Sequence, residues 1–175
     1  MVKKIVISMI VILVLAIGGI FFMNSEDKYD ASKYSLKLTD GFNRGSMMTF
    51  NLLDQFDKDI SLDSSTQKLI VVFSKEMGHI ANNFISSQPK KFLESKGVML
   101  VADISKMPVV IRNTFALPSL RKSEYPTTLI YDSKISDVLK NGKSGDKIFF
   151  ITLENNRIKS VSDGLTAKDI ESFLK

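Results

Sequence analysis

Hydrophobic residues at the start of the chain form one unbroken run, unlike the mixed pattern of the rest. Residues 5–23 are apolar apart from Ser8, Gly18 and Gly19. A helix of this length extends about 28 Å, which is close to the thickness of the hydrocarbon core of a bilayer. A helix in a soluble core would carry polar residues on one face, and this run has no polar face. The pattern therefore predicts a transmembrane helix over residues 1–23.

The ends of this run indicate how the helix would be processed and oriented. The stretch Ile20–Ser25 contains no small-x-small cleavage site, and no cysteine follows for lipid attachment. We therefore expect an uncleaved signal anchor, with a cleaved signal peptide as the alternative. Lys3 and Lys4 precede the run, and two acidic residues, Glu26 and Asp27, follow it. By the positive-inside rule the N-terminus stays in the cytoplasm, and the remaining chain faces the periplasm or the cell exterior.

The polar segment after the run is too poor in apolar residues to build a core. Residues 24–45 contain turn formers at Asp40-Gly41 and Asn43–Gly45. This composition is typical of a linker. We therefore expect a linker over residues 24–45, with one short strand at Tyr34–Leu38, and a folded domain over residues 46–175.

Within the predicted domain, strand-like and helix-like patterns alternate. Leu69–Phe73 is a short β-branched run, typical of a strand covered on both faces, and apolar residues at helical spacing follow it. The predicted elements are a hairpin at Thr49–Leu53 and Ile60–Leu62, a strand at Lys68–Ser74, a helix from Met77 to near Gln88, a strand at Val98–Ala102, a helix from Pro108 to Phe115 ended by Pro118, a strand at Tyr125–Tyr131, a hairpin at Ile148–Leu153 and Arg157–Val161 that turns at Asn155-Asn156, and a helix capped by Thr166 and Asp169. This order predicts an α/β fold with a mixed sheet between two helical layers.

Composition narrows the chemistry that this chain can perform. Hydrophobic residues make up 44% and charged residues 25% of the 175 residues, which is typical of a globular domain. Cysteine is absent. The chain can therefore form no disulfide, thiolate metal site or iron–sulfur cluster, and it can supply no cysteine nucleophile. Thiol-disulfide oxidoreductase and cysteine peroxidase activities are excluded for this chain.

Charge and metal-ligand patterns indicate neither nucleic-acid binding nor a metal site. Residues 24–175 carry 22 basic and 19 acidic side chains, well mixed along the chain, so we expect no nucleic-acid partner. His79 is the only histidine. Asp57, Asp59 and Asp63 lack the glycine pattern of a calcium loop, so we expect no metal site.

Two segments of the domain resemble the thioredoxin-like superfamily. The strand–helix segment Val71–Ile80 resembles the strand that enters the Cys-Gly-Pro-Cys motif of thioredoxins, with Met77-Gly78-His79-Ile80 in place of the motif. Tyr125-Pro126-Thr127 resembles the cis-proline loop that faces this motif. The resemblance covers residues 46–175 and implies a thioredoxin-like three-layer sandwich. It also implies that the redox scaffold is kept without its reactive sulfurs.

A closer resemblance is to uncharacterised membrane-anchored bacterial proteins with this thioredoxin-like pattern. It is carried by Val101–Pro108, Phe115–Pro118 and Tyr125-Pro126, and it implies a bacterial cytoplasmic membrane. Some of these proteins bear the label FAD/FMN-containing dehydrogenase. This chain has no Gly-x-Gly-x-x-Gly motif after a strand, so we expect no cofactor.

In thioredoxin-like proteins, the groove between the motif and the proline binds extended peptides. The resemblance therefore implies a binding groove formed by six residues: Met77, Gly78, His79, Tyr125, Pro126 and Thr127. Tyr125 would offer backbone hydrogen bonds to a peptide, as in strand addition, and an apolar ring. Met77 at helical spacing can also pack in the core, and His79 can be a plain surface residue of a first helical turn.

Three functions fit these patterns. The first is a membrane-tethered, non-enzymatic domain that binds a protein or peptide. The second is an enzyme of another class that uses the groove for a small ligand or a flavin. The third is a structural remnant whose transmembrane helix contacts the partner, although Gly18-Gly19 is not a Gly-x-x-x-Gly pattern. The few polar residues expected around the groove favour binding over catalysis.

Overall fold

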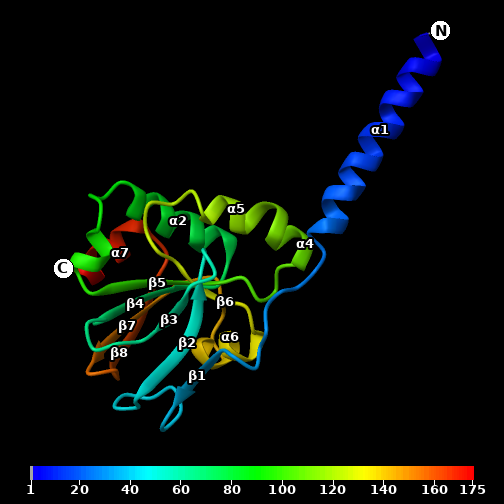
Figure 1. Ribbon diagram of the computed structural model, residues 1–175. Helices are drawn as coiled ribbons and strands as arrows, with labels where there is room; N and C mark the ends of the chain where they lie inside the picture. The colour runs from blue at the N-terminus through cyan, green and yellow to red at the C-terminus, as the bar shows by residue number, and fades with distance from the viewer. Residues whose placement is uncertain (1) are drawn as a thin grey trace.

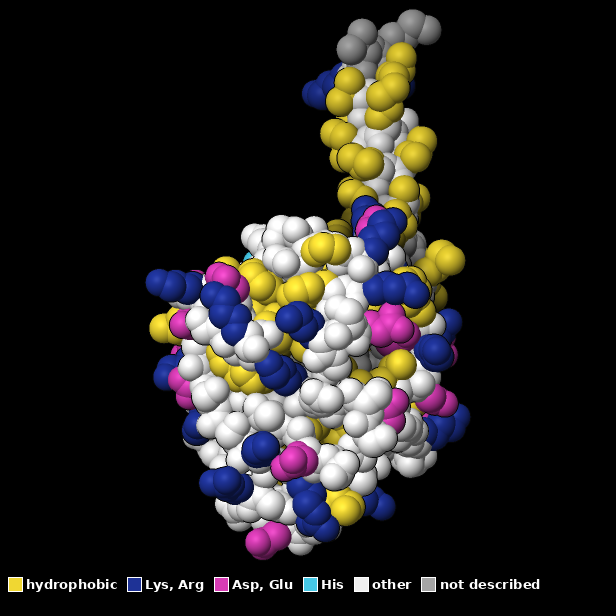
Figure 2. Space-filling view, turned by 90° about the vertical axis from the view of Figure 1, so that its left-hand side faces the viewer, with side chains coloured by type: hydrophobic (Ala, Val, Ile, Leu, Met, Phe, Trp, Pro, Cys, Tyr) yellow, Lys and Arg dark blue, Asp and Glu magenta, His cyan; other side chains and the backbone are white. Residues whose placement is uncertain are grey.

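Helix α1 (Val2–Met23) projects away from the remainder of the molecule in the computed structural model, which describes residues 2–175 (Figure 1). Its surface is hydrophobic along most of its length, with lysine near its N-terminal end (Figure 2). Lys3–Met23 is long and apolar enough to cross a membrane, and none of it is buried in the protein. The structure thus contains the helix that the hydrophobic run predicts.

One mixed sheet organises the domain. Its strands are β1 (Ser35–Leu38), β2 (Met48–Asp54), β3 (Asp59–Ser61), β4 (Lys68–Val72), β5 (Val98–Asp103), β6 (Thr128–Ile130), β7 (Ile148–Glu154) and β8 (Arg157–Gly164). The order is β1-β2-β6-β5-β4-β7-β8, and β3 pairs with β2. Strands β4, β5 and β6 run parallel, whereas the other pairs are antiparallel.

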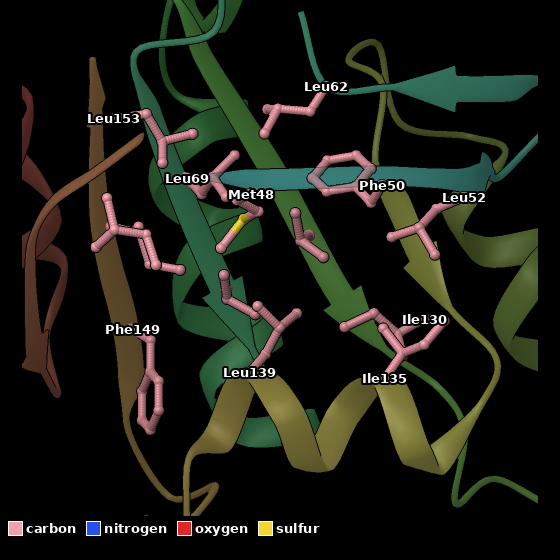
Figure 3. Close-up of a cluster of buried hydrophobic side chains, with 14 residues drawn as sticks. Met48, Phe50, Leu52, Leu62, Leu69, Ile130, Ile135, Leu139, Phe149 and Leu153 are labelled. Carbon is pink, nitrogen blue, oxygen red and sulfur yellow. The ribbon is translucent and has the colours of Figure 1, made fainter. Parts of the chain in front are cut away.

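Helices cover both faces of this sheet because apolar residues point to both sides of the central strands. Leu69 and Val71 of β4 belong to the cluster on which α6 (Ser133–Lys140) packs through Ile135 and Leu139 (Figure 3). The alternate β4 residues face α2 (Lys75–Ser86), α3 (Phe92–Ser95) and α7 (Ala167–Leu174). The predicted three-layer α/β sandwich with a mixed sheet is confirmed.

Local signals in the sequence also predict several turns and caps correctly. The hairpin of β7 and β8 turns at Asn155 and Asn156, which have φ angles of 50° and 61°. Asparagine tolerates this left-handed conformation better than most residues. Thr166 caps α7, and the reciprocal bonds with Asp169 form a capping box.

One prediction about a helix is wrong, and one helix has no counterpart among the predicted elements. Pro118 does not end the preceding helix, because α4 (Val109–Ile111) continues through a π-helical turn (Arg112–Ala116) into α5 (Leu117–Leu120). In the wide turn the amide of Leu117 donates to the carbonyl of Arg112, so Pro118 lies in the first turn of a new segment, where a missing N–H is tolerated. The unpredicted helix is α6, whose eight residues show too short a period and lack the capping box that marks the equally short α7.

The segment predicted as a linker also packs on the domain. It supplies β1, which corresponds to the strand predicted at Tyr34–Leu38 and pairs with β2. Tyr29 stacks on Tyr34 with ring centroids 5.2 Å apart and on Tyr131 of the domain at 4.8 Å. The chain between α1 and β2 is therefore attached to the domain along much of its length.

Candidate functional site

A groove of about 1130 Å³ lies on the face of the sheet that carries α2 and α3. Its floor includes Val72, Leu100 and Ala102, at or near the carboxyl ends of β4 and β5. Helices α2 and α3 form one wall, and the segment from α4 to the loop before β6 forms the other. Figure 2 shows apolar side chains on one face of the domain, with lysine and arginine side chains around them.

Five of the six predicted groove residues line this groove: Gly78, His79, Tyr125, Pro126 and Thr127. They come from α2 and from the loop before β6, so the fold brings the two resembling segments together. Met77 does not line the groove. Only 4% of its surface is exposed, and it packs against the sheet with Ala81 and Ile85. Met77 therefore takes the core position that its helical spacing also allowed.

The start of α2 is a capped helix end. The hydroxyl of Ser74 accepts a hydrogen bond of 3.3 Å from the backbone nitrogen of Met77. Lys75 and His79, one turn apart, are exposed and line the groove. A Cβ atom added at Gly78 would meet no atom within 4 Å. The first turn of α2 is thus an open wall of the groove with polar residues beside it.

The loop at Pro126 differs from the loop that it resembles. No cis peptide bond occurs within residues 2–175, so the Tyr125–Pro126 bond is trans. The fully buried side chain of Gln55 fixes this loop through two hydrogen bonds to its backbone. Its Nε2 donates to the carbonyl of Tyr125 at 2.9 Å, and its Oε1 accepts from the amide of Thr127 at 2.7 Å. A peptide could not pair with these two backbone groups without sharing or displacing Gln55.

Sequence reasoning missed Gln55. It directly follows strand β2, and a polar residue after a strand usually indicates only a turn. Its partners lie 70 and 72 positions further along the chain, so no local signal indicates them. The backbone carbonyl of Gln55 also accepts from Nε of Arg121 at 2.7 Å, which ties the end of α5 to the same point.

Tyr125 links the two walls of the groove. Its hydroxyl donates to the side-chain oxygen of Asn82 on α2. Burial raises the pKa of the Tyr125 hydroxyl above its usual value, so this group stays protonated and able to donate. At the surface, Lys90 and Glu124 form an exposed ion pair of 3.5 Å between the same two walls. The half-buried Tyr125 hydrogen bond is the stronger restraint, because exposed ion pairs contribute little.

The buried carboxylate at the end of β5 has a structural role. Asp103 of β5 accepts hydrogen bonds from Ser136 at 2.5 Å and from the backbone of Ser105 at 2.9 Å, and it pairs with Lys140 at 3.4 Å. These bonds fix α6 to the sheet. Across residues 2–175 no group of three or more histidine, aspartate and glutamate side chains is placed to hold a metal ion.

Similar solved structures share this architecture. A protein from Chlorobium tepidum, assigned as the thiol:disulfide interchange protein DsbE, is 13% identical; the match covers 76% of this chain and 99% of that one, with a TM-score of 0.51. A SCO1/SenC family lipoprotein from Bacillus anthracis is 14% identical over 79% and 97% of the two chains, with a TM-score of 0.51. A protein from Bacteroides thetaiotaomicron, assigned as a protein disulfide isomerase, is 17% identical over 80% and 89%, with a TM-score of 0.50.

No protein-family model matches this chain, and no curated protein sequence does. The similar solved structures show that the domain has a thioredoxin-like fold, as its sequence predicts. At this level of sequence identity the similarity concerns the fold alone. The fold occurs here without cysteine and beside one helix that could anchor it in a membrane.

Proposed function

We propose that this protein is a membrane-anchored, redox-inactive thioredoxin-like domain that binds a protein or peptide partner in its groove. The anchor is helix α1, and Lys3 and Lys4 at its N-terminal end support a domain that faces the periplasm or the cell exterior. The partner is recognised by the side chains that line the groove, because Gln55 occupies the backbone groups of the Pro126 loop.

One observation carries this proposal. An apolar groove of about 1130 Å³ lies where the fold would place its thiol motif, and the chain contains no sulfur group able to react as a thiolate. Apolar clefts with a few polar groups are the usual form of a binding site. The groove is lined at its edge by His79 and Lys75 and by two exposed carboxylates, Glu94 and Glu124, of which Glu124 pairs with Lys90. The buried carboxylate of Asp103 is engaged in structural bonds to Ser136 and Ser105. This distribution supports binding rather than catalysis.

Site-specific photo-crosslinking in cells tests the proposal. A photoreactive amino acid replaces His79 at the groove wall in the full-length chain, and the same residue replaces the exposed Lys159 of β8 as the matched control. We expect a discrete crosslinked protein from position 79 that is absent from position 159. The crosslink should be lost when Gly78→Trp fills the groove. Equal crosslinking from both positions, or a product that Gly78→Trp leaves unchanged, would contradict groove binding.

A further inference from the structure

The C-terminal end of α1 makes an aromatic contact with the domain. The ring of Phe21, within the apolar run, packs edge-on against Phe115 of the π-helical turn, with centroids 6.5 Å apart. Figure 1 shows α1 leaving the domain at the α4 end of this helical segment. Phe115 therefore lies beside the last turn of the helix that we propose to span the membrane.

Hydrogen bonds and an ion pair fix this junction. Nδ2 of Asn113 donates to the carbonyls of Asn24 at 3.1 Å and Glu26 at 3.0 Å. The side chain of Arg112, 5% exposed, pairs with Asp27 at 2.5 Å. The π-helical turn is thus bonded to the first residues after α1. These bonds restrain rotation of the domain about the end of the helix.

Two apolar side chains beside this junction are only partly covered by the protein. Phe115 is 56% exposed and Ile111 is 40% exposed. They lie four positions apart along one helical segment, and both also line the groove. Phe22 and Met23, at the end of α1, are each 82% exposed. The exposed apolar surface of the membrane helix therefore continues onto the domain through Phe21 and Phe115.

We propose that Ile111 and Phe115 are a lipid-docking surface, which lies in the boundary between headgroups and acyl chains of the outer leaflet. Apolar and aromatic residues of surface-bound helices occupy this depth. The occupant is lipid because a spanning α1 brings the bilayer surface to Phe21, and Phe115 contacts Phe21. This inference rests on the proposed membrane anchor. It implies a domain held in one orientation, with the end of its groove open at the lipid surface.

Tryptophan fluorescence tests the docking, since the chain contains no tryptophan. Full-length Phe115→Trp, Phe22→Trp and Val138→Trp variants are reconstituted in phosphatidylcholine–phosphatidylglycerol vesicles that contain lipids brominated along the acyl chain. Phe22 reports insertion of α1. Val138, 42% exposed on α6, is a control on the opposite face of the sheet. We expect Trp at 115 to lose about half of its emission, as a residue at this depth should, and Trp at 138 to lose none.

The outcomes separate the docking from the anchor. Quenching at 22 without quenching at 115 overturns the docking and leaves the anchor intact. No quenching at 22 overturns the anchor and the docking with it. A blue shift at 115 that depends on protein concentration, without quenching, assigns the surface to a second copy of the chain and also overturns the proposal. In the Phe115→Trp background, Ile111→Asp should reduce the quenching at 115, while the same change in the Phe22→Trp background leaves the quenching at 22 unchanged.

Discussion

The side-chain oxygen of Gln55 accepts a hydrogen bond of 2.7 Å from the backbone nitrogen of Thr127, and both groups are buried. With the second bond, from Gln55 to the carbonyl of Tyr125, one amide spans Pro126 from the side opposite the groove. The turn between β2 and β3, which carries Gln55, therefore fixes one wall of the candidate site. This arrangement couples the stability of the hairpin to the shape of the groove.

Replacing Gln55 should loosen this wall. In Gln55→Ala the buried Tyr125 carbonyl and Thr127 amide lose their partner, which should lower the free energy of unfolding by about 1–3 kcal/mol. Urea unfolding of the full chain in detergent micelles measures this loss, and hydrogen exchange measures the protection of the Thr127 amide. Gln88→Ala is the matched control, because the Gln88 side chain bonds only to neighbours on its own helix end. Unchanged protection of Thr127 would contradict the bridging role of Gln55.

Substituting Gly78 should separate stability from binding. A methyl group at this position meets no atom within 4 Å, and alanine is favoured over glycine inside a helix by about 0.5–1 kcal/mol. Gly78→Ala should therefore raise the free energy of unfolding while it narrows the groove and reduces crosslinking from position 79. Gly164→Ala is the contrast, because its Cβ would lie 2.5 Å from the Cβ of Asp169 and should destabilise the fold. A Gly78→Ala protein with unchanged crosslinking would argue against a partner bound along α2.

The layers of the fold could be predicted from the sequence because their signals are local. The β-branched run of β4 and the helical spacing of Met77, Ala81 and Ile85 each indicate an element without knowledge of the rest of the chain. The opposed placement of the two candidate segments followed instead from their resemblance to thioredoxin-like proteins, since no local pattern relates them. The local pattern could not show that Met77 packs inward, since helical spacing fits both a core and a groove position.

The remaining features depend on contacts between distant residues or on unusual backbone geometry. Gln55 and Arg112 are buried polar residues whose partners lie far away in sequence. The π-helical turn that carries the helix past Pro118 has no residue signature of its own. Tyr29 stands in a polar segment of the sequence, and only the fold brings Tyr131 to it. The sequence alone fits both a surface position and a buried contact for such residues, and only the tertiary structure distinguishes the two.

The stacked pair Tyr29 and Tyr131 should make the protein sensitive to strong alkali. Burial raises the pKa of each hydroxyl from 10.0 to about 12, with a further contribution from Asp132 at Tyr29 and from Asp57 at Tyr131. Because the folded-state pKa is above the unfolded value, this stabilisation is fully present below pH 10 and is lost as the pH rises through about 12. Tyrosinate absorbance should show a step near pH 12 that decreases in Tyr29→Phe. A complete titration near pH 10 would contradict the stacked, buried arrangement.

Breaking the ion pair between Arg112 and Asp27 should release the segment after the membrane helix. Asp27→Asn keeps the size of the side chain but removes the charge that the buried guanidinium faces. A hydrogen bond to a charged group contributes about 1.5–3 kcal/mol, and the lower end applies here because Asp27 is partly exposed, so local opening should become about tenfold more frequent. Trypsin should then cleave after the exposed Lys28 about tenfold faster, while the unfolding of the sheet core changes little.

Asp30→Asn is the control for this release, because Asp30 pairs only with the exposed Lys33 and has no contact with Arg112. Its cleavage rate after Lys28 should stay near that of the unaltered chain. In the vesicle experiment, Asp27→Asn should also reduce quenching of Trp at 115 while Trp at 22 stays quenched, since the junction that holds Phe115 at the bilayer would be loose. Equal proteolysis of the two variants would mean that the Asn113 bonds and the Tyr29 stack hold the junction without the ion pair.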